Sequence, residues 1–101
     1  MWGYTDLSDV DIRLLVGRRI KAWRTRQGMS ARHLSLQLGF SHGALNEYEG
    51  GQRELSYRKL WILADFFGIT VEDLLGPPRS KDEHEFLLER AAIPKFEDDD
   101  E

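Results

Sequence analysis

Apolar residues recur every three or four positions along most of the chain, which is the period of an amphipathic helix. In the first such segment the apolar positions are Ile12, Val16, Ile20 and Trp23. Ser8 and Asp11 precede it with the spacing of a capping box, and Gly28 follows it. We therefore expect a long first helix that begins after Ser8 and ends at about Gln27.

Two shorter segments with the same period follow. Ser30 can cap a second helix that ends before Gly39, and Ser41 can cap a third that ends at Gly50-Gly51. The apolar positions of these two segments are Leu34, Leu38, Ala44, Leu45 and Tyr48. The pattern predicts two short helices that are separated by a tight turn.

Ser56 can cap a fourth helix that stops at Gly68, and Thr70-x-x-Asp73 is a capping box for a short fifth helix that closes at Gly76. The fourth helix would bury Leu60, Leu63, Ala64 and Phe67. We expect the aromatic side chains at helical spacing to lie in the core: Trp23, Trp61, Phe66 and Phe67. No stretch alternates with period two, so the predicted fold is an all-α, compact five-helix bundle.

The composition changes after Pro78. Ser80-x-x-Glu83 predicts a short sixth helix, and Pro94 would end it. Its apolar positions are Phe86, Leu87 and Ala91. The acidic run from Glu97 to Glu101 is typical of a disordered end. We accordingly divide the chain into an N-terminal leader (1–10), a helical domain (11–78) and an acidic, partly disordered tail (79–101).

The net charge of −4 is unevenly distributed. Residues 1–78 hold ten Lys and Arg against nine Asp and Glu, whereas residues 79–101 hold four against nine. Within the domain, the stretch from Arg13 to Arg32 carries seven basic residues and no acidic one. Such a stretch is an electrostatic footprint for nucleic acid, and an ordinary solvated helix face would explain it equally well.

The composition also argues against several classes of protein. The chain has no cysteine, and no apolar run approaches the roughly 20 residues that span a bilayer. The first residues lack a signal-peptide pattern, so we expect a cytoplasmic protein without membrane partners. No phosphate-binding glycine loop, activated nucleophile or HExxH pair is present, so we expect neither an enzyme nor a cofactor. His33, His42 and His84 lack carboxylate or cysteine neighbours at ligand spacing, so we expect no metal site.

The segment from Ser30 to Gly50 has the organisation of a helix-turn-helix unit: a short capped helix, a turn containing Gly39 and a second short helix. The DNA major groove is about 12 Å wide and admits one α-helix, while another element must hold the flanking backbone. The second helix would enter the groove and the first would brace it. Any helix–turn–helix pair in a bundle would satisfy this geometry.

A larger set of residues sharpens this interpretation. It comprises Arg19-Ile20 with Arg24, Gly28-Met29-Ser30, Leu34, Leu38-Gly39-Phe40-Ser41, Leu45, Tyr48-Glu49, Gly51, Leu60, Leu63-Ala64, Phe67-Gly68-Ile69 and Leu74. With these residues, the stretch from Arg19 to Leu75 resembles the Cro and phage-repressor type (Xre-like) helix-turn-helix DNA-binding family. The resemblance implies a repressor-like bundle, binding to double-stranded DNA, and association with a bacterial or phage nucleoid.

The resemblance also implies roles for individual residues. The base-reading residues would be His42, Gly43, Asn46 and Glu47. The phosphate-contacting residues would be Ser30, Ala31, Arg32, Ser41, Gly51, Gln52 and Arg53. Arg24 and Glu49 match a buried structural ion pair. The implied function is a sequence-specific transcriptional regulator, a repressor, that reads the major groove with the helix beginning at Ser41.

We expect a homodimer, because one short helix reads only a few base pairs and two half-sites supply the missing specificity. The surfaces suspected at the dimer interface are Leu74, Leu75 and the Phe86/Leu87 face.

The chain departs from the family pattern at three positions. Ala31 replaces a glutamine that clamps a phosphate, Gly43 would cost a helix roughly 1 kcal/mol, and Glu47 is acidic on the DNA-facing surface. These residues leave two alternatives open. One is a protein-interaction module with weakened DNA binding. The other is an antitoxin-like regulator whose tail, residues 79–101, binds a partner protein.

Overall fold

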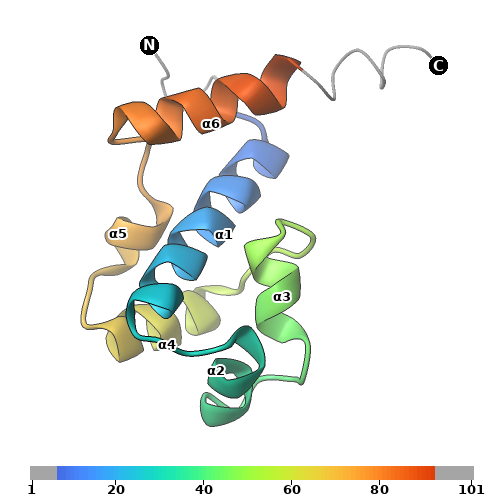
Figure 1. Cartoon of the computed structure of the whole chain (residues 1–101), viewed down its shortest axis with the longest axis vertical. Coiled ribbons are helices and arrows are strands. Elements are labelled where there is room, and N and C mark those ends of the chain that lie inside the picture. Colours follow the sequence, from blue (N-terminus) through green and yellow to red (C-terminus); the bar gives the residue numbers. More distant parts are fainter. Residues whose placement is uncertain (1–6, 93–101) are drawn as a thin grey trace, which may run out of the picture.

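The computed structural model describes residues 7–92, which form six helices joined by short connections and no strand (Figure 1). The helices are α1 (Asp9–Arg26), α2 (Ala31–Gln37), α3 (Ala44–Glu49), α4 (Tyr57–Phe67), α5 (Val71–Leu75) and α6 (Lys81–Ala92). The all-α bundle predicted from the sequence is confirmed, and so is the sixth helix.

Local capping explains where five of these helices begin, and at α6 the hydroxyl of Ser80 accepts the backbone N–H of Glu83. Ser8 and Asp11 form a reciprocal capping box at α1, and Thr70 with Asp73 forms another at α5. Ser30 caps α2 by accepting the backbone N–H of the residue three positions on, and Ser56 caps α4 in the same way. Each of these caps joins residues only three apart, which is why the sequence predicts them.

The core is formed by the inner faces of α1 to α5. It includes Ile20, Leu34, Leu45, Leu63 and Leu74, all with no measurable exposure. Trp23 stacks against Phe67 with ring centroids 6.2 Å apart, and Phe66 packs edge-on to Phe67. The predicted places of Trp23, Phe66 and Phe67 in the core are therefore confirmed.

The prediction that Trp61 belongs to the core is wrong, because its side chain is 73% exposed. The buried face of α4 is made by Leu60, Leu63, Ala64 and Phe67. Trp61 directly follows Leu60, and one residue turns the helix by about 100°, so its side chain points into solvent. Helical spacing alone did not distinguish these two faces.

Gly17, in the middle of α1, permits a close approach of α1 to α3. A Cβ atom at this position would lie 2.4 Å from the carbonyl oxygen of Tyr48 and 2.6 Å from that of Glu49. Because both neighbouring atoms belong to the backbone, a larger residue would push the two helices apart. The sequence analysis did not single out this glycine.

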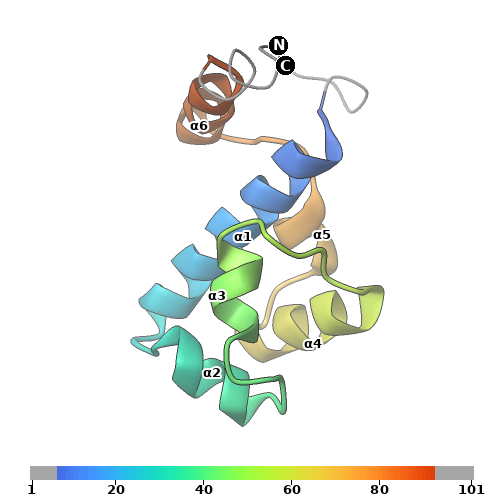
Figure 2. The ribbon, with the colours of Figure 1, turned by 90° about the vertical axis from the view of Figure 1, so that its right-hand side faces the viewer.

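The sixth helix lies across α1 at the end of the molecule opposite α2 (Figures 1 and 2). Its side chain Leu87 is only 1% exposed, and Leu74 of α5 is fully buried. Neither can form the dimer surface that the sequence analysis suspected, because both serve the core of one chain. Leu75, which is 40% exposed, is still available.

Two sequence predictions lie outside the described residues: the leader up to residue 6 and the acidic run from Glu97 to Glu101. Within residues 7–92, no helix is long and apolar enough to cross a membrane.

Candidate nucleic-acid interface

The second and third helices form the predicted helix–turn–helix unit, with α3 on one face of the molecule and α1 behind it (Figure 2). The start of α3 differs from the prediction. Ser41 does not cap it: the helix begins at Ala44 with Gly43 as its N-cap, and no side chain of the N-cap residue is available. The backbone carbonyl of Ser41 accepts the N–H of Ala44 at 3.1 Å instead.

The missing local cap is replaced by Ser35 of α2. Its hydroxyl oxygen accepts the backbone N–H of Leu45 at 3.2 Å, and the side chain is fully buried. This bond satisfies one of the N–H groups that a helix leaves without an internal partner. A residue ten positions earlier therefore holds the start of α3, which reasoning from neighbouring residues did not find.

The outer surface of α3 and the turn before it is polar or lacks a side chain. Ser41, His42 and Gly43 are exposed in the turn, and Asn46 is exposed on the helix. The inward-facing residues of α3 are all buried: Ala44, Leu45 and Tyr48. Gly43 lies before the helix, so the helix-interior penalty expected for glycine does not apply.

Glu47, the acidic residue on this surface, forms an ion pair with Arg53 of the loop that follows α3. The guanidinium donates to the carboxylate at 2.7 Å and lies over the ring of Tyr48, 5.6 Å from its centroid. The hydrogen bond to Glu47 raises the pKa of Arg53 further above its ordinary value. Arg53 is thus held beside α3, and its charge is largely compensated.

The residues predicted to contact phosphate differ in what they can offer. Ser30, Arg32, Ser41, Gln52 and Arg53 are exposed. Ala31 is buried in the core, so it can present only its backbone N–H to solvent.

Gly51, which the resemblance predicts to contact phosphate, is buried in the structure. Its N–H donates to the carbonyl of Tyr48 at 3.1 Å, and its own carbonyl accepts from Arg13 at 3.1 Å. Its φ of 72° lies in the left-handed region, and a Cβ there would lie 2.6 Å from Leu14. Gly51 therefore shapes the loop, and its N–H and carbonyl are both hydrogen-bonded within the fold.

Arg24 and Glu49 form a two-bond ion pair beneath this surface. Nε and Nη2 of Arg24 donate to the carboxylate at 2.6 and 3.0 Å, and Nη1 donates to the carbonyl of Met29 at 2.7 Å. The two side chains are only 11% and 8% exposed. Hydrogen bonding to Glu49 raises the pKa of Arg24. The pair links the end of α3 to α1 and to Met29 in the loop before α2.

The basic stretch from Arg13 to Arg32 does not form a single charged face. Arg19 and Arg24 are engaged in ion pairs, and Arg13 binds the loop carbonyl described above. Arg18 and Arg26 lie over the rings of Phe86 and Trp23. Three of the seven basic residues are therefore engaged within the molecule, and four stay exposed: Arg18, Lys21, Arg26 and Arg32. Of these four, Arg32 lies on the helix–turn–helix unit.

The sequence matches the family model described as helix-turn-helix over residues 20–74, more than half of the chain. The protein belongs to this helix-turn-helix family. The DNA-binding domain of BldD is 30% identical, with a TM-score of 0.59, over 68% of this chain and 99% of that one. NHTF, a hypothetical transcription factor from Neisseria, shares the fold with a TM-score of 0.63 at 21% identity, over 71% of this chain and 83% of that one. No curated protein matches the sequence.

Across residues 7–92, no three His, Cys, Asp or Glu side chains gather at distances that would hold a metal ion.

Proposed function

We propose that the protein is a sequence-specific DNA-binding transcriptional regulator that acts as a homodimeric repressor and inserts α3 into the major groove. The observation that supports this most directly is the division of α3 into a buried apolar face and a polar outer face. A helix that reads base edges needs such an outer face, because its donors and acceptors must be free to meet the groove. Family membership and the likeness to the DNA-binding domain of BldD support the same function.

In this proposal the turn before α3 approaches the bases first. His42 and Asn46 carry the donors and acceptors that can distinguish base pairs, and the absent side chain at Gly43 lets the backbone come close to the DNA. Ser30, Arg32 and Ser41 contact phosphates on one side of α3, and Gln52 and Arg53 on the other. Occupation of a promoter by the dimer would then repress transcription and place the protein in the nucleoid.

The test is selection of bound duplexes from a random DNA pool, with sequencing, at two salt concentrations. We expect a palindromic site whose affinity falls steeply with salt, since phosphate contacts release counterions. Recovery of sequences without enrichment, with weak binding at both salt concentrations, would contradict the proposal.

Three substitutions then assign the roles. Arg53→Ala should weaken all sequences about equally, whereas His42→Ala should relax the preference at one base pair by about 1–3 kcal/mol. Glu47→Gln should strengthen binding, because it removes a negative charge from the DNA face and releases Arg53 from its ion pair. A Glu47→Gln chain that binds less tightly would show that the carboxylate itself reads a base.

The Glu47–Arg53 pair also supports the second candidate function, a protein-interaction module, because it cancels two charges on the surface in question. Such a module would show no effect of Arg53→Ala or His42→Ala in a DNA assay. The third candidate, a tail that binds a partner protein, needs a truncation that spares α6, since Glu83 contacts Arg19. Removal of residues 93–101 should leave DNA binding intact and abolish the partner complex.

A further inference from the structure

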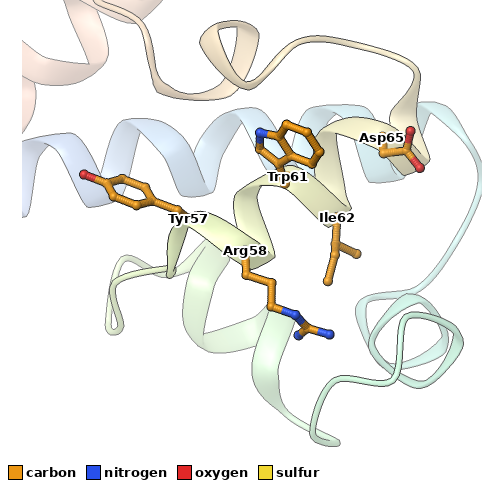
Figure 3. A pocket seen from close by; sticks show the side chains of 5 residues that line it. All are labelled: Tyr57, Arg58, Trp61, Ile62 and Asp65. Atoms are coloured by element: carbon orange, nitrogen blue, oxygen red, sulfur yellow. The ribbon is translucent and has the colours of Figure 1, made fainter.

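The aromatic side chains of Tyr57 and Trp61 on α4 lie outside the hydrophobic core and outside the proposed DNA interface. Tyr57 is 84% exposed and Trp61 is 73% exposed. Together with Arg58, Ile62 and Asp65 they line a hollow of about 530 Å³ on the outside of this one helix (Figure 3). None of the residues predicted to contact DNA lies among them. We call these five residues the α4 surface.

The apolar part of the α4 surface extends toward the end of α5. Tyr57 also lines a second hollow, of about 200 Å³, together with Leu60 and the half-exposed Leu75. Large exposed aromatic side chains next to one another are characteristic of a protein-binding surface rather than of an ordinary solvated face.

The charges on the α4 surface indicate what binds there. Arg58, Trp61, Ile62 and Asp65 lie at positions i, i+3, i+4 and i+7, so they share one side of the helix. The basic residue stands near the beginning of this stripe and the acidic residue near its end, with the apolar pair between them. A helix with this order of charges is complementary to a copy of itself that runs in the opposite direction.

We propose that the α4 surface is the interface of a homodimer in which two α4 helices pack antiparallel about a two-fold axis between positions 61 and 62. In this arrangement Arg58 meets Asp65 of the second copy, and Asp65 meets its Arg58. Trp61 of each copy packs against Ile62 of the other. A two-fold interface has this reciprocity, because each contact occurs twice.

The inference goes beyond the proposed function and rests on it in one respect: the dimer serves to bring two reading helices to one DNA site. The loop 50–56 joins α3 to α4 along the chain. Aromatic side chains bury roughly 150–250 Å² each, so the interface would be at the small end of the range for proteins. We expect a weak dimer in solution that forms fully on DNA, where the second copy is held close by.

Sedimentation of the purified chain from about 1 μM to about 1 mM tests the dimer. We expect reversible dimerisation, and Trp61→Ala should raise the dissociation constant by about 30-fold, as for a central interface residue. Leu88→Ala, which removes a large apolar side chain that is 56% exposed from α6, should leave dimerisation unchanged. A native chain that stays monomeric throughout, or equal effects of the two variants, would overturn the proposal.

A charge exchange tests the antiparallel arrangement itself. Arg58→Asp and Asp65→Arg should each weaken self-association at least tenfold, because each puts like charges opposite one another. An equimolar mixture of these two variants should dimerise again, since both facing pairs then have opposite signs. Failure of the mixture to associate would exclude this pairing.

The result for DNA is measured separately on the duplex recovered by selection. A chain that dimerises through α4 but binds no DNA duplex would contradict the proposed function and would not contradict the dimer. A chain that binds its site as an independent monomer would overturn the dimer alone.

Discussion

Two arginine–glutamate pairs link α1 to two other helices of the molecule, α3 and α6. Arg24 and Glu49 hold the end of α3, whereas Arg19 and Glu83 hold α6 and the segment that leads to it. In the first pair Arg24 donates two hydrogen bonds to Glu49 and one to the carbonyl of Met29. The second is more extensive: Arg19 donates two bonds to Glu83 and others to the carbonyls of Leu74, Gly76 and Pro77.

The comparison shows that one kind of contact serves two purposes in this fold. The Arg24 pair holds the end of α3, the helix proposed to enter the major groove, so its loss should affect both stability and DNA binding. The Arg19 pair makes α6 part of the packed unit, at the end away from that helix (Figure 1). Its loss should affect stability while the DNA surface of the molecules that remain folded is unchanged.

The largest effect is expected for Arg19→Ala. The substitution leaves Glu83 and three backbone carbonyls without their donor, so we expect a loss of about 4 kcal/mol in the free energy of unfolding. Urea denaturation measures it. Arg18→Ala is the matched control, since its neighbouring guanidinium is exposed and lies over Phe86. Equal stability of the two variants would contradict the role of the Arg19 network.

Arg24→Ala should cost about 3 kcal/mol, because Glu49 is left buried without a partner. Unlike the Arg19 variant, its folded fraction should also bind the selected DNA less tightly. Denaturation and titration with DNA measure the two effects. In a double-mutant cycle with Glu49→Ala the two losses should be far from additive. Additive losses would mean that the pair does not act as a unit.

Glu83→Gln should cost about 2 kcal/mol at neutral pH, the value of a hydrogen bond between charged groups. Hydrogen bonding from Arg19 lowers the pKa of Glu83 in the folded protein. The stabilisation is therefore complete above about pH 4, the ordinary range for this carboxyl, and is lost as the pH falls through the lower folded value. Denaturation curves at several pH values should show that the difference in free energy of unfolding between Glu83→Gln and the native chain becomes smaller in acid.

The exposed Glu85→Gln provides the control for this series, because it changes the same kind of charge on the same helix. The difference in free energy of unfolding between the native and Glu83→Gln chains could instead stay constant from neutral pH into acid. That result would show that the carboxylate charge is not what stabilises α6.

The smallest effect is expected for Ser35→Ala, about 1 kcal/mol, because it leaves the N–H of Leu45 without an acceptor. Hydrogen exchange at Leu45 should become faster than elsewhere in the core. Ser41→Ala, at the position where a local cap was predicted, should change stability by less than about 0.5 kcal/mol. A larger loss of stability in Ser41→Ala would show that Ser41 does cap α3.

The same contrast separates what could be predicted from sequence from what could not. Ser8, Ser30, Ser56 and Thr70 act on residues three positions away, so their helices could be placed from neighbouring residues alone. Arg19 and Glu83 are 64 positions apart, and nothing local connects them. Gly17 escaped notice for a related reason: its neighbour α3 is close only in the folded chain.

The candidate site divides in a similar way. The resemblance to a family indicated which helix faces outward and which residues flank it. It did not indicate that Arg53 would form an ion pair with Glu47. Nor did it indicate that the N–H and the carbonyl of Gly51 would both form hydrogen bonds within the fold. Those bonds depend on the loop geometry of this chain. The exposure of Trp61 could not be predicted from the sequence, because apolar residues occupy two sides of α4 and their spacing does not show which side is buried.

The cap supplied by Ser35 has a consequence for how the protein can change over evolution. The first turn of α3 is held by the hydroxyl of Ser35 and by the backbone carbonyls of Ser41 and Gly43, so the side chains of residues 41–43 take no part in starting the helix. Replacements there are free to alter the preferred operator at little cost in thermal stability. A lineage carrying this scaffold could acquire new target genes by drift in three exposed positions, while the serine that makes such drift harmless stays fixed out of contact with the DNA.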